Sequence, residues 1–274
     1  MTKLGSFKKR IQHLLAGKVS SLAQSSWLPL KKGAFLHRVF DTPATAIVRG
    51  KAIRIHVASF VELDRVRRYS TKEPDTLGWI DQFQPDTVFF DVGANIGVYS
   101  LYAAAKHESV RVFAFEPESL NYAALNQNIA LNSLQTVIRA YCLALSESAS
   151  LSDLSIAKMR AGGSNNQFGD GGSAPSHIQG ALGLSLDDLC SRWGLPTPHT
   201  LKIDVDGLEL PILRGAEQIL SHPHFRSLLI ELRKDDPAQA DAVKAICERA
   251  GLVMVSQSHR KKSADPMVIF EKRQ

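Results

Sequence analysis

A glycine-rich turn with two polar side chains follows an apolar run near residue 90. The turn reads Asp91-Val92-Gly93-Ala94-Asn95-Ile96-Gly97, and Glu116 stands about 20 residues after it. Glycines at such a turn let the backbone approach a ligand closely. A carboxylate at the end of the next strand can accept hydrogen bonds from both hydroxyls of a ribose. Together these features predict a site for a cofactor that contains adenosine.

The differences between this turn and a dinucleotide-binding loop decide which cofactor is expected. Asn95 stands at the position of the middle glycine, and Asp91 places a carboxylate beside the loop. That charge would repel a pyrophosphate, but it would favour the ammonium and sulfonium groups of S-adenosylmethionine, which has no phosphate. We therefore expect S-adenosylmethionine. A nucleotide-dependent oxidoreductase is one alternative, and a helix-capping aspartate with packing glycines is another.

A second group of carboxylates, Asp204, Asp206 and Glu209, surrounds Gly207 after a later apolar run. A carboxylate at such a strand end can align a bound substrate and remove a proton from it. Clustered carboxylates raise one another's pKa, so Asp204 or Asp206 could serve as the base near neutral pH. The competing interpretation is a Mg²⁺ site formed by Asp204, Asp206 and Glu231, because that cation prefers oxygen ligands.

Alternating strands and helices are expected to position these groups. The predicted strands are 87–92, 111–115, 136–145, 201–205, 228–232, 252–255 and 267–270, and the predicted helices are 98–106, 119–132, 210–220 and 238–250. Continuous apolar strands between helices indicate a mostly parallel sheet with both faces covered. The predicted fold class is α/β, a Rossmann-like doubly wound sheet.

Two parts of the chain depart from this alternation. Residues 146–183 are rich in Gly, Ser and Asn, which indicates an irregular insertion, either a substrate lid or a surface loop. Residues 1–84 are predicted to form a partly helical N-terminal extension before a catalytic domain at 85–274. Within it, apolar residues at 4–15 recur at helical spacing, which suits packing on this domain or on a partner, with peripheral membrane contact as an alternative.

The composition of the chain excludes several other classes of protein. The chain has 274 residues with 33 Lys+Arg and 27 Asp+Glu, a net charge of +6 and 44 % hydrophobic residues, as in ordinary globular proteins. The three cysteines are too scattered for a disulfide framework or structural zinc, which favours a reducing compartment. No apolar stretch approaches the length of a membrane span, so we expect a cytoplasmic protein, with a homo-oligomer possible. Its basic residues are dispersed without a nucleic-acid-binding motif, so no nucleic-acid partner is expected.

Several segments together resemble the FkbM-type methyltransferases among the S-adenosylmethionine-dependent Rossmann-like enzymes. They are FFDVGANIGVYS (89–100), AFEPESLNYAALNQNI (114–129), ALS (144–146), SLDDL (185–189), LKIDVDGLELPILRGA (201–216) and LIEL (229–232), with Glu73-Pro74 as an upstream acidic-proline element. The resemblance covers about residues 70–272. It implies methyl transfer from S-adenosylmethionine to a hydroxyl, which we expect to belong to a sugar, glycolipid or polysaccharide precursor.

The resemblance also assigns roles by position. Asp91, Gly93, Ala94, Asn95 and Gly97 would border the methionine part of the cofactor, Glu116, Pro117 and Asn121 the ribose, and Leu143 and Ala144 the adenine. Leu208 stands where the family frequently has His. If that His is the base in relatives, His177 of the insertion is the substitute here, and it joins Asp204 and Asp206 as a catalytic candidate.

Two alternatives come from other functional classes. One is a non-catalytic Rossmann-like binding protein, which the intact Asp91 and Glu116 disfavour. The other is a nucleic-acid methyltransferase, which the lack of an Asn/Asp-Pro-Pro-Tyr type of base-flipping element disfavours.

Overall fold

The computed structural model of the chain divides it into two units, residues 1–42 and residues 43–274. The described residues are 43–163, 166–169, 175–258 and 265–273, all within the second unit. The predicted amphipathic helix at 4–15 lies outside them. The second unit begins at Pro43, so it includes a large part of the segment that the sequence assigned to an N-terminal extension.

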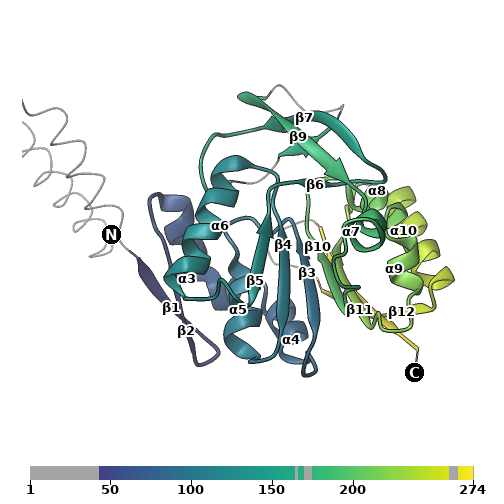
Figure 1. Cartoon of the computed structure of the whole chain (residues 1–274), viewed down its shortest axis with the longest axis horizontal. Coiled ribbons are helices and arrows are strands. Elements are labelled where there is room, and N and C mark those ends of the chain that lie inside the picture. Colours follow the sequence, from purple (N-terminus) through teal and green to yellow (C-terminus); the bar gives the residue numbers. More distant parts are fainter. Residues whose placement is uncertain (1–42, 164–165, 170–174, 259–264, 274) are drawn as a thin grey trace, which may run out of the picture. The chain divides into compact units, whose positions relative to one another are not determined.

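A seven-stranded sheet forms the centre of this unit, in the order β12-β13-β11-β10-β3-β4-β5 (Figure 1). Its strands are β3 (Val88–Val92), β4 (Arg111–Phe115), β5 (Ile138–Tyr141), β10 (Thr200–Ile203), β11 (Ser227–Glu231), β12 (Leu252–Ser258) and β13 (Met267–Lys272). The pairs β3–β4, β4–β5, β3–β10 and β10–β11 are parallel, whereas β13 is antiparallel to both of its neighbours. The predicted mostly parallel, Rossmann-like sheet is confirmed.

Helices cover both faces of the sheet because successive strand side chains point to opposite sides. On β3, Phe89 belongs to one apolar core and Phe90 to the other. The first core includes side chains of α3 (Phe60–Lys72), α4 (Pro74–Asp81), α5 (Val98–Lys106) and α6 (Ser119–Leu131). The second includes α7 (Leu186–Ser191), α8 (Glu209–Arg214), α9 (Glu217–Ser221) and α10 (Pro237–Arg249). Figure 1 shows the two groups of helices on opposite sides of the sheet.

The N-terminal part of this unit packs into the first core. β1 (Ala44–Val48) and β2 (Lys51–Ile55) form an antiparallel hairpin whose buried side chains include Val48 and Ile53. Trp79 of α4 donates a hydrogen bond to Ser227 Oγ of β11 at 3.0 Å. The hairpin, α3 and α4 therefore belong to the same folded unit as the sheet.

The insertion after β5 forms a small sheet, so the prediction of an irregular segment was wrong. β6 (Ala144–Leu145), β7 (Ser150–Ile156), β8 (Gln167–Phe168) and β9 (His177–Leu184) are ordered β6-β9-β7-β8. Leu154 and Ile156 of β7 alternate inward, but the Ser and Gly residues around them hide this period in the sequence. Figure 1 shows β7 and β9 lying across one end of the central sheet.

Two predicted elements are divided in the structure. The strand expected at 136–145 is split into β5 and β6, and the helix expected at 210–220 into α8 and α9. Across the described parts of the chain, every helix is too short or too polar to cross a membrane. All three cysteines are free thiols.

Candidate active site

A cleft of about 140 Å³ opens where β3, β4 and β10 end. Its lining includes Gly93 and Asn95 after β3, Glu116 after β4, and Asp204 and Asp206 after β10. β3 and β10 are adjacent in the sheet although a large part of the chain separates them, and ligands bind at such switch points of α/β sheets. The glycine-rich turn and the later carboxylate cluster therefore face the same space.

The turn after β3 lies close to β10 because residue 93 has no side chain. Gly93 has φ +74°, and a Cβ at this position would lie 2.1 Å from the carbonyl oxygen of Asp204. Asn95 also has a positive φ, 54°, which asparagine adopts more readily than most residues. Ala94 and Gly97 are buried in the turn and complete it rather than line the cleft. The backbone of the turn thus forms part of the cleft floor.

The Glu116 carboxylate lines the cleft and is almost fully buried. Its Oε2 accepts a hydrogen bond from Asn95 N at 2.8 Å, and its Oε1 accepts one from Glu118 N at 3.0 Å. Burial raises the pKa of Glu116 to about 7, although these two hydrogen bonds oppose the rise. A carboxylate oxygen has about two acceptor positions, so Oε2 keeps capacity for a ligand hydroxyl.

Asp91 lies beneath the cleft and forms an ion pair with Lys202. Its side chain is fully buried, and Ser100 Oγ donates to Oδ2 at 2.6 Å. Lys202 Nζ lies 3.2 Å from Asp91 Oδ1 and 3.4 Å from Asp204 Oδ2. Burial alone would lower the pKa of Lys202, but the Asp91 and Asp204 carboxylates outweigh it and raise the pKa. Asp91 is therefore linked to Asp204, which lines the cleft, through Lys202.

The carboxylates of the β10 turn have different environments. Asp206 is half-buried, lines the cleft and accepts a hydrogen bond from Asn166 N at 3.0 Å. Glu209 is 1 % exposed and is bonded to Gly207 N and Gln239 Nε2, and burial raises its pKa to about 7. Asp204 and Asp206, not Glu209, are therefore the carboxylates of this turn that a ligand in the cleft can reach.

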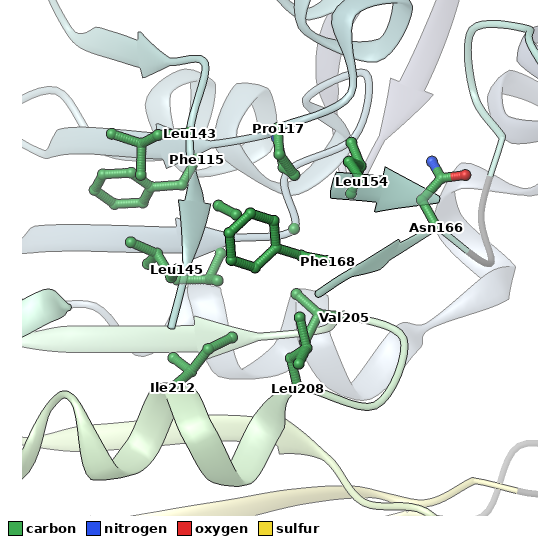
Figure 2. Close-up of a pocket in the computed structure, with 13 residues that line it drawn as sticks. Phe115, Pro117, Leu143, Leu145, Leu154, Asn166, Phe168, Val205, Leu208 and Ile212 are labelled. Carbon is green, nitrogen blue, oxygen red and sulfur yellow. The ribbon is translucent and has the colours of Figure 1, made fainter. Parts of the chain in front are cut away.

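An apolar pocket of about 50 Å³ adjoins the cleft and shares Gly93, Pro117, Asn166 and Val205 with it. Leu143 and Ala144, which were predicted to face adenine, line this pocket. Figure 2 shows the ring of Phe168, from β8, in the middle of the lining side chains. The pocket is therefore closed on one side by the insertion.

Some candidate residues are not brought to the cleft. His177 is exposed at the start of β9, opposite Ile156 of β7, and lines neither pocket. Its proposed role as a base has no geometric support. Among the residues that the structure describes, no three or more His, Cys, Asp or Glu side chains form a group able to hold a metal ion. The alternative Mg²⁺ site at Asp204, Asp206 and Glu231 stays a prediction.

The sequence analysis missed the basic residues of the cleft. Arg65 and Lys72 of α3 line it, and they stand two helical turns apart on one face. Gly163 and Asn166 of the insertion line it as well. The spacing of Arg65 and Lys72 is the only signal that the sequence offered, and it is also typical of a solvated helix face.

Comparison with known sequences identifies the family. A model of the Methyltransferase FkbM domain matches residues 91–252, more than half of the chain. The chain belongs to the FkbM methyltransferase family. This confirms the resemblance found in the sequence, and the protein is an S-adenosylmethionine-dependent methyltransferase.

Individual relatives are similar to this FkbM-family methyltransferase over much of their length. The hexuronic acid methyltransferase AglP of Haloferax volcanii is 28 % identical over 225 residues, which cover 81 % of this chain and 85 % of AglP. The 31-O-demethyl-FK506 methyltransferase FkbM of Streptomyces tacrolimicus is 27 % identical over 207 residues, covering 64 % of this chain and 76 % of that protein.

A solved structure supports the fold. The crystal structure of methyltransferase FkbM from Methylobacillus flagellatus is 13 % identical, with a TM-score of 0.50, and the match covers 79 % of this chain and 62 % of that one.

Proposed function

We propose that this FkbM-family methyltransferase transfers the methyl group of S-adenosylmethionine to a hydroxyl of a sugar or of a sugar-containing precursor. The observation that carries the proposal is the cleft in which the β3 turn, Glu116 and the carboxylates of the β10 turn meet. The name of AglP, a hexuronic acid methyltransferase, supports a carbohydrate acceptor.

The donor set of the cleft fits S-adenosylmethionine. Glu116 would accept the ribose hydroxyls, with Asn121 beside it, since the Nδ2 of Asn121 lies 3.4 Å from Glu116 Oε1. The apolar pocket next to Pro117 and Ala144 would take the adenine ring. Gly93 and Asn95 would border the methionine part. When bound there, the cofactor supplies a methyl carbon that its sulfonium already activates.

The carboxylates of the β10 turn would handle the acceptor. A hydroxyl must lose its proton as the new carbon–oxygen bond forms. The Lys202 ammonium, 3.4 Å from Asp204 Oδ2, offsets the charge of Asp204, whereas Asp206 is held by a backbone N–H. We therefore assign proton removal to Asp206 and alignment of the acceptor to Asp204.

Isothermal titration with S-adenosylmethionine and S-adenosylhomocysteine tests the cofactor site. We expect Glu116→Ala to abolish binding, whereas Glu108→Ala, which removes an exposed carboxylate outside the cleft, should bind as wild type does. Unchanged affinity in the Glu116 variant would disprove the placement of the ribose.

Mass spectrometry of methylated products tests the acceptor side. The enzyme would be incubated with S-adenosylmethionine and a panel of neutral sugars, uronic acids and glycosides. Asp206→Asn should preserve S-adenosylhomocysteine binding and lower turnover, whereas Asp241→Asn on the exposed side of α10 should change neither. Full turnover in the Asp206 variant would remove that residue from the mechanism.

A further inference from the structure

Two basic side chains line the cleft, and the proposed function does not explain why they are there. Arg65 and Lys72 both come from α3 and face the same cleft as Glu116, Asp204 and Asp206. Cations and carboxylates thus line the same small space. A ligand that fits it best carries both signs of charge, or carries an anionic group that reaches the α3 side.

The guanidinium of Arg65 is fixed in place by the insertion. Its Nε and Nη2 donate to the carbonyl oxygen of Gly162 at 3.1 and 2.7 Å. Gly162 in turn donates its N–H to Asn121 Oδ1 at 2.8 Å. A guanidinium has five N–H donors, so the group keeps several for a ligand.

The close approach of Arg65 depends on the absence of a side chain at residue 162. Gly162 has φ +79°, and a Cβ there would lie 3.3 Å from Arg65 Nε and 3.1 Å from Val61 Cγ1. A larger residue would crowd Val61 and Arg65 and would strain a backbone that has a positive φ. The turn that contains Gly162 therefore acts as a support for the Arg65 side chain.

The Lys72 ammonium contacts a buried carboxylate, while its side chain is partly exposed. Its Nζ lies 3.1 Å from Oε1 of Glu73, whose side chain is 1 % exposed, while the Lys72 side chain itself is 36 % exposed. An ammonium has three donors, so the contact with Glu73 leaves donors for a ligand. An Arg and a Lys presented in this way are suited to bind a carboxylate with charge-assisted hydrogen bonds.

We propose that Arg65 and Lys72 form a carboxylate-binding subsite of the cleft. The proposal rests on the proposed function, because the ligand would be one of its two substrates. The carboxylate belongs either to the amino-acid end of S-adenosylmethionine or to a uronic acid acceptor. In the first case the ammonium of the same ligand would face the carboxylates at the strand ends.

The first arm of the test asks whether the cofactor is the source. Arg65→Met and Lys72→Met remove the charges while keeping side chains of similar reach, and Arg67→Met changes an exposed position of the same helix as a control. Titrations use S-adenosylhomocysteine and 5′-methylthioadenosine, which lacks the amino-acid group. A cofactor subsite predicts a loss of about tenfold to a hundredfold in affinity for the first ligand and none for the second.

The second arm asks whether the acceptor is the source. Saturation-transfer NMR with D-glucuronate and D-glucose is recorded at saturating S-adenosylhomocysteine. An acceptor subsite predicts that wild type prefers glucuronate, that both α3 variants lose this preference, and that their affinity for S-adenosylhomocysteine is unchanged.

A second kind of variant separates function from folding. Gly162→Ala keeps both charges but crowds Arg65 and strains the turn at φ +79°, so we expect it to weaken the same ligand as Arg65→Met, with thermal unfolding confirming the fold. If none of the three variants loses affinity for either carboxylate ligand, the proposal is overturned. Failure of wild type to bind S-adenosylhomocysteine would instead contradict the proposed function.

Discussion

At the scale of single residues, Glu116 is expected to couple cofactor binding to pH. Burial raises its pKa to about 7, so the carboxyl is increasingly protonated below that pH. A protonated carboxyl accepts fewer hydrogen bonds from ribose hydroxyls. The affinity for S-adenosylhomocysteine should therefore rise as pH increases from about 6 to 8, approaching a tenfold change per pH unit on the acid side. Titration calorimetry across this range measures the slope.

The control for this prediction is Glu116→Gln, which should bind S-adenosylhomocysteine more weakly and with a flatter pH profile.

Glu116 also affects the stability of the folded protein. Its pKa in the folded protein lies above the reference value of 4.5, so the folded state binds the proton more tightly. Glu116 thus lowers the free energy of unfolding as pH rises from about 4.5 to 7, and Glu116→Gln should reduce that dependence. An unchanged profile in the variant would assign the titration to another group.

The buried Lys202 makes a second residue-scale prediction. Asp91 Oδ1 accepts no hydrogen bond from any described residue and depends on the Lys202 ammonium at 3.2 Å. Lys202→Met would leave a fully buried carboxylate without its cation, at an expected cost of about 3–5 kcal/mol in the free energy of unfolding. Urea denaturation measures this cost.

A double variant identifies the origin of the loss. Lys202→Met combined with Asp91→Asn removes both members of the ion pair and should recover a large part of the stability. If the double variant is as unstable as the single one, the ion pair is not the source. The conservative Lys202→Arg keeps the charge but not the volume, so it separates packing from electrostatics.

The residue scale also shows what the sequence could and could not predict. Asp91 and Glu116 were identified because their types and spacing have a chemical meaning. The pairing of Asp91 with Lys202 depends on the register between β3 and β10, which places the two residues opposite each other. Such a register is decided by packing across the whole sheet, so no local pattern contains it.

At the scale of elements, the helices and strands with a strong apolar pattern were predicted, and those with a weak apolar pattern were not. The helix at 98–106 and the strand at 111–115 were predicted with the bounds that the structure has, because their apolar runs are dense and their ends are marked. The insertion was missed because β7 and β9 carry exposed apolar residues, such as Leu151 and Ile178, among Ser and Gly. Its position over the apolar pocket became visible only in the fold.

This insertion carries a prediction about ligand entry. The apolar pocket of about 50 Å³ has Phe168 in the middle of its lining (Figure 2), so we expect this side chain to move when a purine ring enters. Phe168 closes the pocket from β8, which has only two residues and pairs with Leu154 and Ser155 of β7. Phe168→Ala should therefore increase the association rate constant of S-adenosylhomocysteine several-fold, as measured by stopped-flow fluorescence.

A loss of affinity in Phe168→Ala would assign a different role to this side chain. If Phe168 packs on the adenine ring in the bound state, Phe168→Ala should lower the affinity through faster dissociation, with no gain in association rate. Leu151→Ala provides the control, because Leu151 is 85 % exposed on the same small sheet and lines neither pocket.

At the scale of the whole molecule, the cleft at the strand ends is completed by a part of the chain that precedes the family match. The match begins at residue 91, and the sequence analysis placed the catalytic domain from residue 85. In the structure, the β1–β2 hairpin, α3 and α4 pack on the sheet. Of these elements, α3 supplies Arg65 and Lys72 to the cleft. Short strands and helices of this kind bury few side chains each, so the sequence gives only a weak signal for them.

Two shortened chains test this organisation. A protein that begins at Pro43 retains the whole described unit, so it should unfold cooperatively and bind S-adenosylhomocysteine as the full chain does. A protein that begins at residue 85 lacks Ile53, Tyr69, Leu77 and Trp79, which are at most 6 % exposed in the first core. Removing them would expose part of the sheet face, including Phe89, whose ring contacts Trp79. Because burial of apolar side chains is the main stabilising contribution to folding, we expect this shorter protein to aggregate or to lose its cooperative unfolding transition in calorimetry. If it instead folds and binds the ligand normally, residues 43–84 are an accessory layer and α3 has no part in the site.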